Sequence, residues 1–216
     1  TTWIGGMGVV MFALVVLPTM GRSKMTLSNV EMSSLARDNY RYRAQMIVHV
    51  LLVVYVGLTA ISTVMLKLSG MNWFDALCHA MSACATSGFS TKNASVAYFD
   101  SPLIETVLIL TMGIAGMHFG LIYATVTGKR NNLFRSEVTR WYVGILLGCS
   151  VLIAVSLYAA DIYPTLTSSF RHAAFQVGSI ITTTGFSSCD FDLWPTLSKE
   201  ILVMLMFVGA CAGSTG

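Results

Sequence analysis

The sequence predicts an all-α membrane protein that crosses the bilayer several times and contains tandem repeats of helix, re-entrant pore helix, polar filter turn and helix. Hydrophobic residues make up 55% of the chain and charged residues only 11%, whereas a typical soluble domain carries about 25% charged residues. The phrase Gly-Phe-Ser also occurs twice, starting at Gly88 and at Gly185, 97 positions apart. Each copy follows an apolar stretch that is too short to cross a membrane.

Apolar runs of two lengths alternate along the chain. A helix needs about 20 residues to cross the hydrocarbon core. The runs that we predict as membrane-spanning cover residues 3–20, 45–66, 102–127 and 141–160, and a fifth run begins near residue 195 and continues to 212. Two shorter runs, 72–85 and 166–181, contain polar residues. Runs of this length are predicted as buried or re-entrant half-helices.

Positive charge gathers in the connecting segments 21–44 and 128–140, which hold nine of the 13 lysine and arginine residues. Cytoplasmic loops carry such an excess, so we expect both segments to be cytoplasmic. Two spanning runs lie between them, and the half-helix between these runs must therefore enter and leave at the outer face. The second half-helix has the same relation to its neighbours, so both polar turns are expected to face one pore from the outside.

The turns that follow the half-helices are the candidate binding site. Their residues are Ala85, Thr86, Ser87, Gly88 and Phe89 in the first turn, and Thr182, Thr183, Thr184, Gly185 and Phe186 in the second. Non-helical backbone at membrane depth is tolerated where it lines a watery cavity, and carbonyl groups there can replace the hydration shell of a cation. One copy alone is equally compatible with an ordinary turn, but two copies at the same topological place favour an ion filter.

Four stretches of the sequence resemble the Trk/Ktr superfamily of potassium transporters, specifically the membrane subunit of the bacterial type. They start at Trp3, Ala85, Tyr98 and Gly209 and read Trp-Ile-Gly-Gly-Met-Gly, Ala-Thr-Ser-Gly-Phe-Ser-Thr, Tyr-Phe-Asp-Ser-Pro and Gly-Ala-Cys-Ala-Gly-Ser-Thr-Gly. That family has four helix–pore helix–helix repeats around one central pore, as in potassium channels, and each repeat gives one filter segment.

The resemblance implies a division of the chain into three parts. Residues 1–43 would hold the second helix of repeat one and a cytoplasmic loop, 44–140 would be repeat two, and 141–216 would be repeat three up to the middle of its last helix. We therefore expect the sequence to be an excerpt of a longer protein.

The same resemblance assigns an intramembrane gating loop to the last residues of the sequence. These are Gly209, Ala210, Cys211, Ala212, Gly213, Ser214, Thr215 and Gly216. The composition agrees with this assignment, because a segment composed mainly of small residues packs poorly as a lipid-facing helix and unwinds at low cost. Close helix–helix packing through small residues is the alternative, and the residues alone leave the two equal.

The function that the resemblance implies is potassium uptake through the filter, across the bacterial plasma (inner) membrane. It implies K+ bound by filter carbonyls only, no cofactor, a homodimer, a cytosolic nucleotide-binding regulatory subunit and no nucleic-acid partner. Transport of another cation such as Na+ and a non-conducting structural subunit are the alternatives. An intramembrane hydrolase would need Ser214 beside a histidine such as His118, which no spacing supports, so we do not expect an enzyme.

Five polar residues near the half-helices have simpler predictions. Asp75 is expected near the N-terminus of the first half-helix, where a negative charge suits the helix dipole. Glu105 is expected in a first-turn, interfacial position, and Arg171 is expected to snorkel or to cap a helix. His79 and His172 lie at different distances from the filter glycines, so we expect them to hydrogen-bond locally or to lie at an interface. The cysteines show no paired spacing, and we predict no disulfide.

Overall fold

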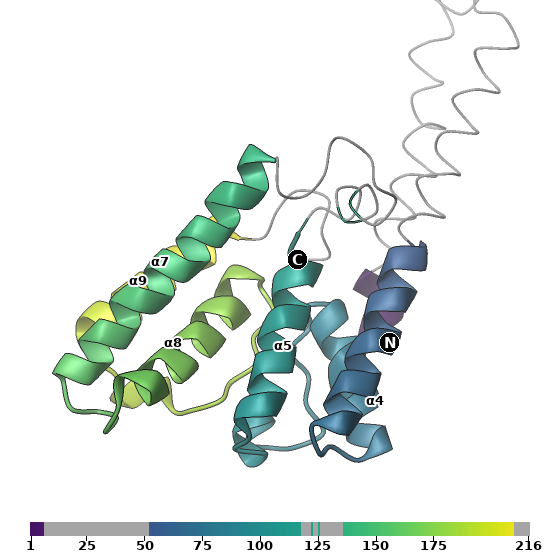
Figure 1. Cartoon of the computed structure of the whole chain (residues 1–216), viewed down its shortest axis with the longest axis horizontal. Helices are drawn as coiled ribbons and strands as arrows, with labels where there is room; N and C mark the ends of the chain where they lie inside the picture. Colours follow the sequence, from purple (N-terminus) through teal and green to yellow (C-terminus); the bar gives the residue numbers. More distant parts are fainter. Residues whose placement is uncertain (7–51, 118–121, 123–124, 126–135, 210–216) are drawn as a thin grey trace, which may run out of the picture.

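The computed structural model describes residues 1–6, 52–117, 122, 125 and 136–209, and the regular elements in these ranges are helices (Figure 1). The basic segment 21–44 and residues 128–135 of the second basic segment lie outside the described residues. The same holds for 7–20 of the first predicted spanning run.

The helices follow the order predicted from the sequence. Their bounds are Leu52–Leu68, α4 Trp73–Cys84, α5 Pro102–Ala115, α7 Glu137–Ala159, α8 Leu166–Ile181 and α9 Thr196–Val208, with short 3-10 turns η1 at Ser95–Tyr98 and η3 at Phe191–Leu193. The two predicted half-helices are thus α4 and α8. In the described part, α7 alone is long and apolar enough to cross a membrane, and Leu52–Leu68 and α5 are shorter apolar helices.

Side chains fix where the two half-helices begin. Asn72 accepts a hydrogen bond from the backbone N–H of Asp75 at 2.8 Å, and Thr165 accepts one from Ser168 at 3.2 Å. Such caps satisfy backbone donors that have no partner within the helix, and each contributes about 1 kcal/mol. Asp75 lies in the first turn of α4, as predicted from the helix dipole.

The helices that precede the half-helices end in matching turns. The N–H of Met71 donates to the Leu66 carbonyl and that of Ile162 donates to the Leu157 carbonyl, both at 3.2 Å. The residue before each donor, Gly70 in the first case, has a positive φ. A left-handed residue closes a helix in this way, because its N–H and the next can reach back to the orphan carbonyls. The chain therefore reverses direction in the same manner before α4 and before α8.

Helix α8 joins the two repeats. It contacts α7 and α9 of its own repeat and also α5 of the preceding one, beside which α4 packs (Figure 1). Phe175 of α8 is fully buried in the apolar cluster of α4 and α5, whereas Val177 lies in the cluster of α7, α8 and α9. Because lipid is as apolar as these side chains, close van der Waals packing stabilises such contacts in a membrane protein.

Residues 1–6 lie against the helix Leu52–Leu68. The indole nitrogen of Trp3 donates to the Thr59 hydroxyl at 3.1 Å, and the Tyr55 hydroxyl donates to the Trp3 carbonyl at 3.0 Å. A Cβ added at Gly6 would lie 3.5 Å from the backbone of Ala85. The N-terminal residues thus back directly onto the start of the first polar turn.

Candidate functional site

The two polar turns leave their half-helices through the same hydrogen bonds. In the first turn, the N–H of Ser87 donates to the Ser82 carbonyl at 3.0 Å. In the second, the N–H of Thr184 donates to the Ser179 carbonyl at 2.9 Å. These two pairs occupy equivalent positions in the repeats, so the sequence repeat is also a repeat of backbone geometry.

Left-handed residues alternate with others in both turns. Thr86 and Gly88 have φ of 48° and 67°, and Thr183 and Gly185, at the equivalent positions, have φ of 58° and 87°. In an ordinary strand successive carbonyls point to opposite sides. A change of handedness at every second residue interrupts this alternation, and a carbonyl-lined ion site requires carbonyls that face one side.

The two left-handed threonines are strained. A β-branched residue is a rare occupant of this region, and the left-handed conformation costs about 1–2 kcal/mol. Local hydrogen bonds hold the second turn in place: the Thr182 hydroxyl lies 2.7 Å from the Thr184 hydroxyl and donates to the Gly178 carbonyl, also at 2.7 Å. Strain of this kind persists where the surroundings enforce it, and it clusters at ligand sites.

The structure brings the two turns into direct contact. A Cβ placed on Gly88 would overlap the carbonyl oxygen of Thr184 and would lie 2.9 Å from the carbonyl carbon of Gly185. The first turn can approach the second this closely only because position 88 has no side chain. Backbone atoms of residues far apart in the sequence therefore lie side by side at this point.

The last residue of each turn has a different environment. Phe186 is 1% exposed and stacks on His79 of α4, with ring centroids 5.8 Å apart. Phe89, its equivalent in the first turn, is 69% exposed. The second turn is thus packed against the preceding repeat through Phe186, whereas Phe89 has no such cover in the described part of the chain.

After the first turn the chain returns to the N-terminus of its own half-helix. The Thr91 hydroxyl donates to the Asp75 carboxylate at 2.5 Å, and the Lys92 ammonium lies 3.3 Å from its other oxygen. The hydrogen bond from Thr91, followed by the contact with Lys92, lowers the pKa of Asp75 below its ordinary value. Both ends of the loop around α4 therefore lie at one face, as a re-entrant element requires.

An ion pair links the two repeats near the same face. The Arg171 guanidinium donates to both carboxylate oxygens of Glu105 at 2.7 Å and to Asp100 at 3.1 Å. Glu105 lies in the first turn of α5, as predicted, and is 1% exposed. The prediction that Arg171 snorkels or caps is wrong, because a buried carboxylate needs a charged, hydrogen-bonding partner and the planar fork of Arg171 provides it.

Two residues that sequence reasoning missed lie behind the turns. The ring nitrogen Nε2 of His79 is 2.8 Å from the Ser90 hydroxyl, and the Gln176 amide donates to the Ser187 hydroxyl at 3.3 Å. His79 and Gln176 lie 97 positions apart, as do the two serines. Comparison by position in the repeat, instead of comparison of His79 with His172 by residue type, would have found this pair.

The predicted gating loop falls at the edge of the described residues. Helix α9 ends at Val208, and Gly209 has φ of 65° and ψ of −174°, a combination that is essentially restricted to glycine. Residues 210–216, and with them Ser214, lie outside the described residues, as does His118.

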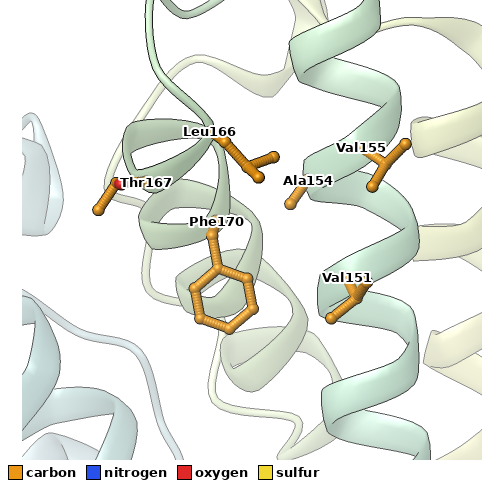
Figure 2. Close-up of a pocket in the computed structure, with 6 residues that line it drawn as sticks. All are labelled: Val151, Ala154, Val155, Leu166, Thr167 and Phe170. Atoms are coloured by element: carbon orange, nitrogen blue, oxygen red, sulfur yellow. The ribbon is translucent and has the colours of Figure 1, made fainter.

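An open apolar groove lies between α7 and α8, away from the turns. Figure 2 shows the residues that line it: Val151, Ala154, Val155, Leu166, Thr167 and Phe170. The hydroxyl of Thr167 is the one polar side-chain group among them. This groove supplies no catalytic or ion-binding group, so the turns remain the candidate site.

Comparison with known proteins decides the family. The family model TrkH, described as a cation transport protein, matches residues 1–216. The chain belongs to the TrkH family. Among its curated relatives, the Trk system potassium uptake proteins TrkH of Halomonas elongata and Salmonella typhimurium are 38% and 36% identical to this TrkH-family chain. Each alignment is 216 positions long and covers 99% of the chain and 45% of the relative.

The fold comparison agrees with this membership. The crystal structure of the potassium transporter TrkH from Vibrio parahaemolyticus matches all of the chain and 43% of its own length, with a TM-score of 0.82 and 30% identity. The predicted all-helical membrane fold is therefore confirmed. The TrkH-family chain spans less than half the length of these relatives.

Proposed function

We propose that the chain contributes two segments of a filter through which K+ is taken up. The ion-binding carbonyls would be those of the two turns, 85–89 and 182–186. The observation that carries the proposal is the repeated left-handed geometry of the two turns, together with their contact at Gly88. Relatives named as potassium uptake proteins support K+ as the ion, and a filter for Na+ is the alternative.

The geometry suits passage of a dehydrated cation. Carbonyl oxygens turned to one side replace water molecules around the ion, and binding must be weak enough to release it again. Half-helices α4 and α8 both end at the turns. The C-terminal end of a helix carries a partial negative charge of about half an electron. Both ends therefore favour a cation over an anion.

The segment 209–216 is proposed as the gate below the filter. The backbone of Gly209, which ends α9 in a conformation open mainly to glycine, supports an interruption of the helix at this point. Replacement of Gly209 with alanine should favour a continuous helix. We expect Gly209→Ala to change the rate of K+ uptake and to leave the preference for K+ over Na+ unchanged, and an unchanged rate would contradict the gate.

Family membership also supports proposals about the whole protein. These are a multi-pass protein of the bacterial inner membrane, a homodimer with a cytosolic nucleotide-binding regulatory subunit, and the division of the chain at residues 43/44 and 140/141 into parts of three repeats. Isolation of the full-length protein from inner membranes, followed by measurement of its mass and of its co-purifying subunits, tests these proposals together.

The filter is tested by replacing one of its glycines. In full-length protein expressed in bacteria that lack K+ uptake, Gly185→Ser should abolish growth at low K+, because a side chain at φ of 87° displaces the carbonyls. Gly144→Ser is the matched control: Gly144 is an exposed glycine of α7 with no atom within 4 Å of an added Cβ. Equal growth of cells with the two variants, when both proteins are present in the membrane in equal amounts, would contradict the filter proposal.

A further inference from the structure

The serine that follows each polar turn is contacted by a polar side chain of the turn's own half-helix. His79 reaches the Ser90 hydroxyl at 2.8 Å, and Gln176 reaches the Ser187 hydroxyl at 3.3 Å. Each serine follows the filter glycine and phenylalanine directly, at the outer end of the turn. The same contact is therefore made twice, by two different chemical groups.

We propose that His79 and Gln176 are positioning residues for ion selection. Each fixes the outer end of its filter segment through a serine hydroxyl, so that the carbonyls keep the spacing suited to K+ and cannot close around the smaller Na+. This inference rests on the proposed filter and adds to it the side chains that would set its selectivity. It concerns residues that touch the turn and not the ion.

The hydrogen bonds of His79 define the tautomer of its neutral ring. Its Nδ1 lies 2.8 Å from the backbone carbonyl of Asp75, which can only accept, so Nδ1 carries a proton. In the neutral ring, Nε2 accepts from the Ser90 hydroxyl, whose oxygen accepts in turn from the N–H of Lys92 at 3.1 Å. Both nitrogens of a neutral, fully buried ring are thus used, and the ring has one orientation.

The same ring touches the next filter segment. Phe186 stacks on His79 with an interplanar angle of 20°, and Phe99 meets it edge-on with ring centroids 5.4 Å apart. The carbonyl of Phe186 accepts a hydrogen bond from Ser179 at 2.7 Å. His79 therefore lies between the first turn, which it holds through Ser90, and the second turn, which it contacts through an aromatic ring.

Gln176 makes the equivalent contact with the donor and acceptor roles exchanged. Its amide donates to the Ser187 hydroxyl, which donates to the Cys189 carbonyl at 2.8 Å. The N–H of Ser187 donates to the Ser95 hydroxyl at 3.3 Å, and its carbonyl accepts from Ala97 at 3.1 Å. A glutamine can both donate and accept through its amide. A glutamine at position 79 can therefore accept the hydrogen bond from the Ser90 hydroxyl that His79 accepts.

This interchangeability gives a sharp experiment. In full-length protein, K+ uptake is measured with increasing external Na+, and the ratio of K+ to Na+ preference is compared among His79→Gln, His79→Leu and Gln176→Leu. We expect His79→Gln to keep the wild-type preference and each leucine variant to lower it about tenfold, the effect of losing the one buried hydrogen bond to the serine.

His172→Leu is the matched control for the leucine variants. His172 also lies on a half-helix, but its ring stacks on Tyr163 at 4.7 Å and its Nδ1 has no hydrogen-bond partner in the described part of the chain. We expect its preference for K+ to stay at the wild-type value. If His79→Leu does not fold, Ser90→Ala removes the hydroxyl alone and should lower the preference to a similar extent.

The outcomes separate this inference from the proposed function. An unchanged preference in His79→Leu, or in Ser90→Ala where the leucine variant does not fold, overturns the inference while the filter stands. Equal losses in His79→Gln and His79→Leu also overturn it, because they show that only the shape of the ring matters. A wild-type protein without K+ uptake, or one insensitive to Gly185→Ser, would instead overturn the filter itself.

Discussion

Gly88 adopts its positive φ at the point where the first turn touches the second. A Cβ there would overlap the Thr184 carbonyl, whereas nothing lies within 4 Å of a Cβ on Gly185. Both glycines carry the left-handed backbone, so both resist substitution for conformational reasons. Only at Gly88 does a steric cost add to the conformational one, and this difference distinguishes two residues that the sequence repeat makes equivalent.

A comparison of two alanine variants tests this difference. Gly185→Ala should destabilise the full-length protein by about 1 kcal/mol, the cost of a left-handed alanine. Gly88→Ala should cost about 2–4 kcal/mol, because overpacking against rigid backbone adds about 1–3 kcal/mol. Thermal unfolding of the purified protein measures both, with Gly144→Ala as control. Equal shifts for the two variants would show that the turns do not touch in the full-length protein.

Asp75 gives a prediction that depends on pH. Its lowered pKa means that the folded state binds the proton less tightly than the unfolded state does. The contribution of the carboxylate to stability is therefore complete above about pH 4, the ordinary pKa of aspartate, and is lost as the pH falls through the lowered value.

Comparison with Asp75→Asn measures this contribution. We expect the variant to unfold at a lower temperature than wild type by the same amount at pH 7 and at pH 5, and by a smaller amount at pH 3. Asp192→Asn, in an exposed loop, should match wild type at each pH. A difference between wild type and Asp75→Asn that grows toward low pH would contradict the assigned network with Thr91 and Lys92.

Among the helices, α4 and α8 show how far the sequence determines the fold. Their limits were predictable because each begins after a polar cap, Asn72 or Thr165, and ends where an apolar run meets a Thr-rich turn. These are local signals. The orientation of the half-helices in the membrane, which we infer from the basic segments and the order of the apolar runs, stays a prediction.

Contacts between repeats could not be predicted, because no local signal in the sequence indicates them. Nothing near Arg171 in the sequence points to Glu105, and nothing near Gly88 points to Thr184, because such contacts depend on how α5 and α8 pack. The equivalence of His79 and Gln176 escaped notice for another reason. Imidazole and amide groups can make the same hydrogen bond, so the repeat conserves a contact and changes the residue type.

The ion pair between α5 and α8 gives a prediction for these elements. Arg171→Gln should cost about 3 kcal/mol, because it leaves the buried carboxylate of Glu105 without its partner. Glu105→Gln should cost less, since the guanidinium is partly exposed and keeps Asp100 at 3.1 Å. The double variant should be more stable than Arg171→Gln alone.

Chemical unfolding of the full-length protein and a double-mutant cycle measure this coupling. A cycle in which the two single effects simply add would show that Arg171 and Glu105 do not interact. An Arg171→Lys variant sharpens the test. Lysine keeps the charge but lacks the planar fork, so we expect it to recover only part of the lost stability.

At the scale of the whole molecule, the first described repeat supports the polar turn of the second. The loop after the first turn braces the second turn through Ser95 and Ala97, which bond to the backbone of Ser187. His79 of the first half-helix covers Phe186 of the second turn. If the two turns form the proposed filter, a change in one repeat should therefore alter ion binding at the turn of its neighbour.

The exposure of Phe89 gives a prediction about the contacts between repeats in the full-length protein. Phe186, its equivalent, is 1% exposed because the preceding repeat covers it, while Phe89 is 69% exposed in the described part of the chain. If repeats follow one another around a pore in the full-length protein, a further repeat covers Phe89 in the same way. Phe89→Ala should then cost about 3 kcal/mol of stability, as expected for a buried phenylalanine and for Phe186→Ala. The midpoint of chemical unfolding of the full-length protein measures both variants, and an effect of Phe89→Ala as small as that of exposed Leu193→Ala would exclude a ring of repeats closed at this position.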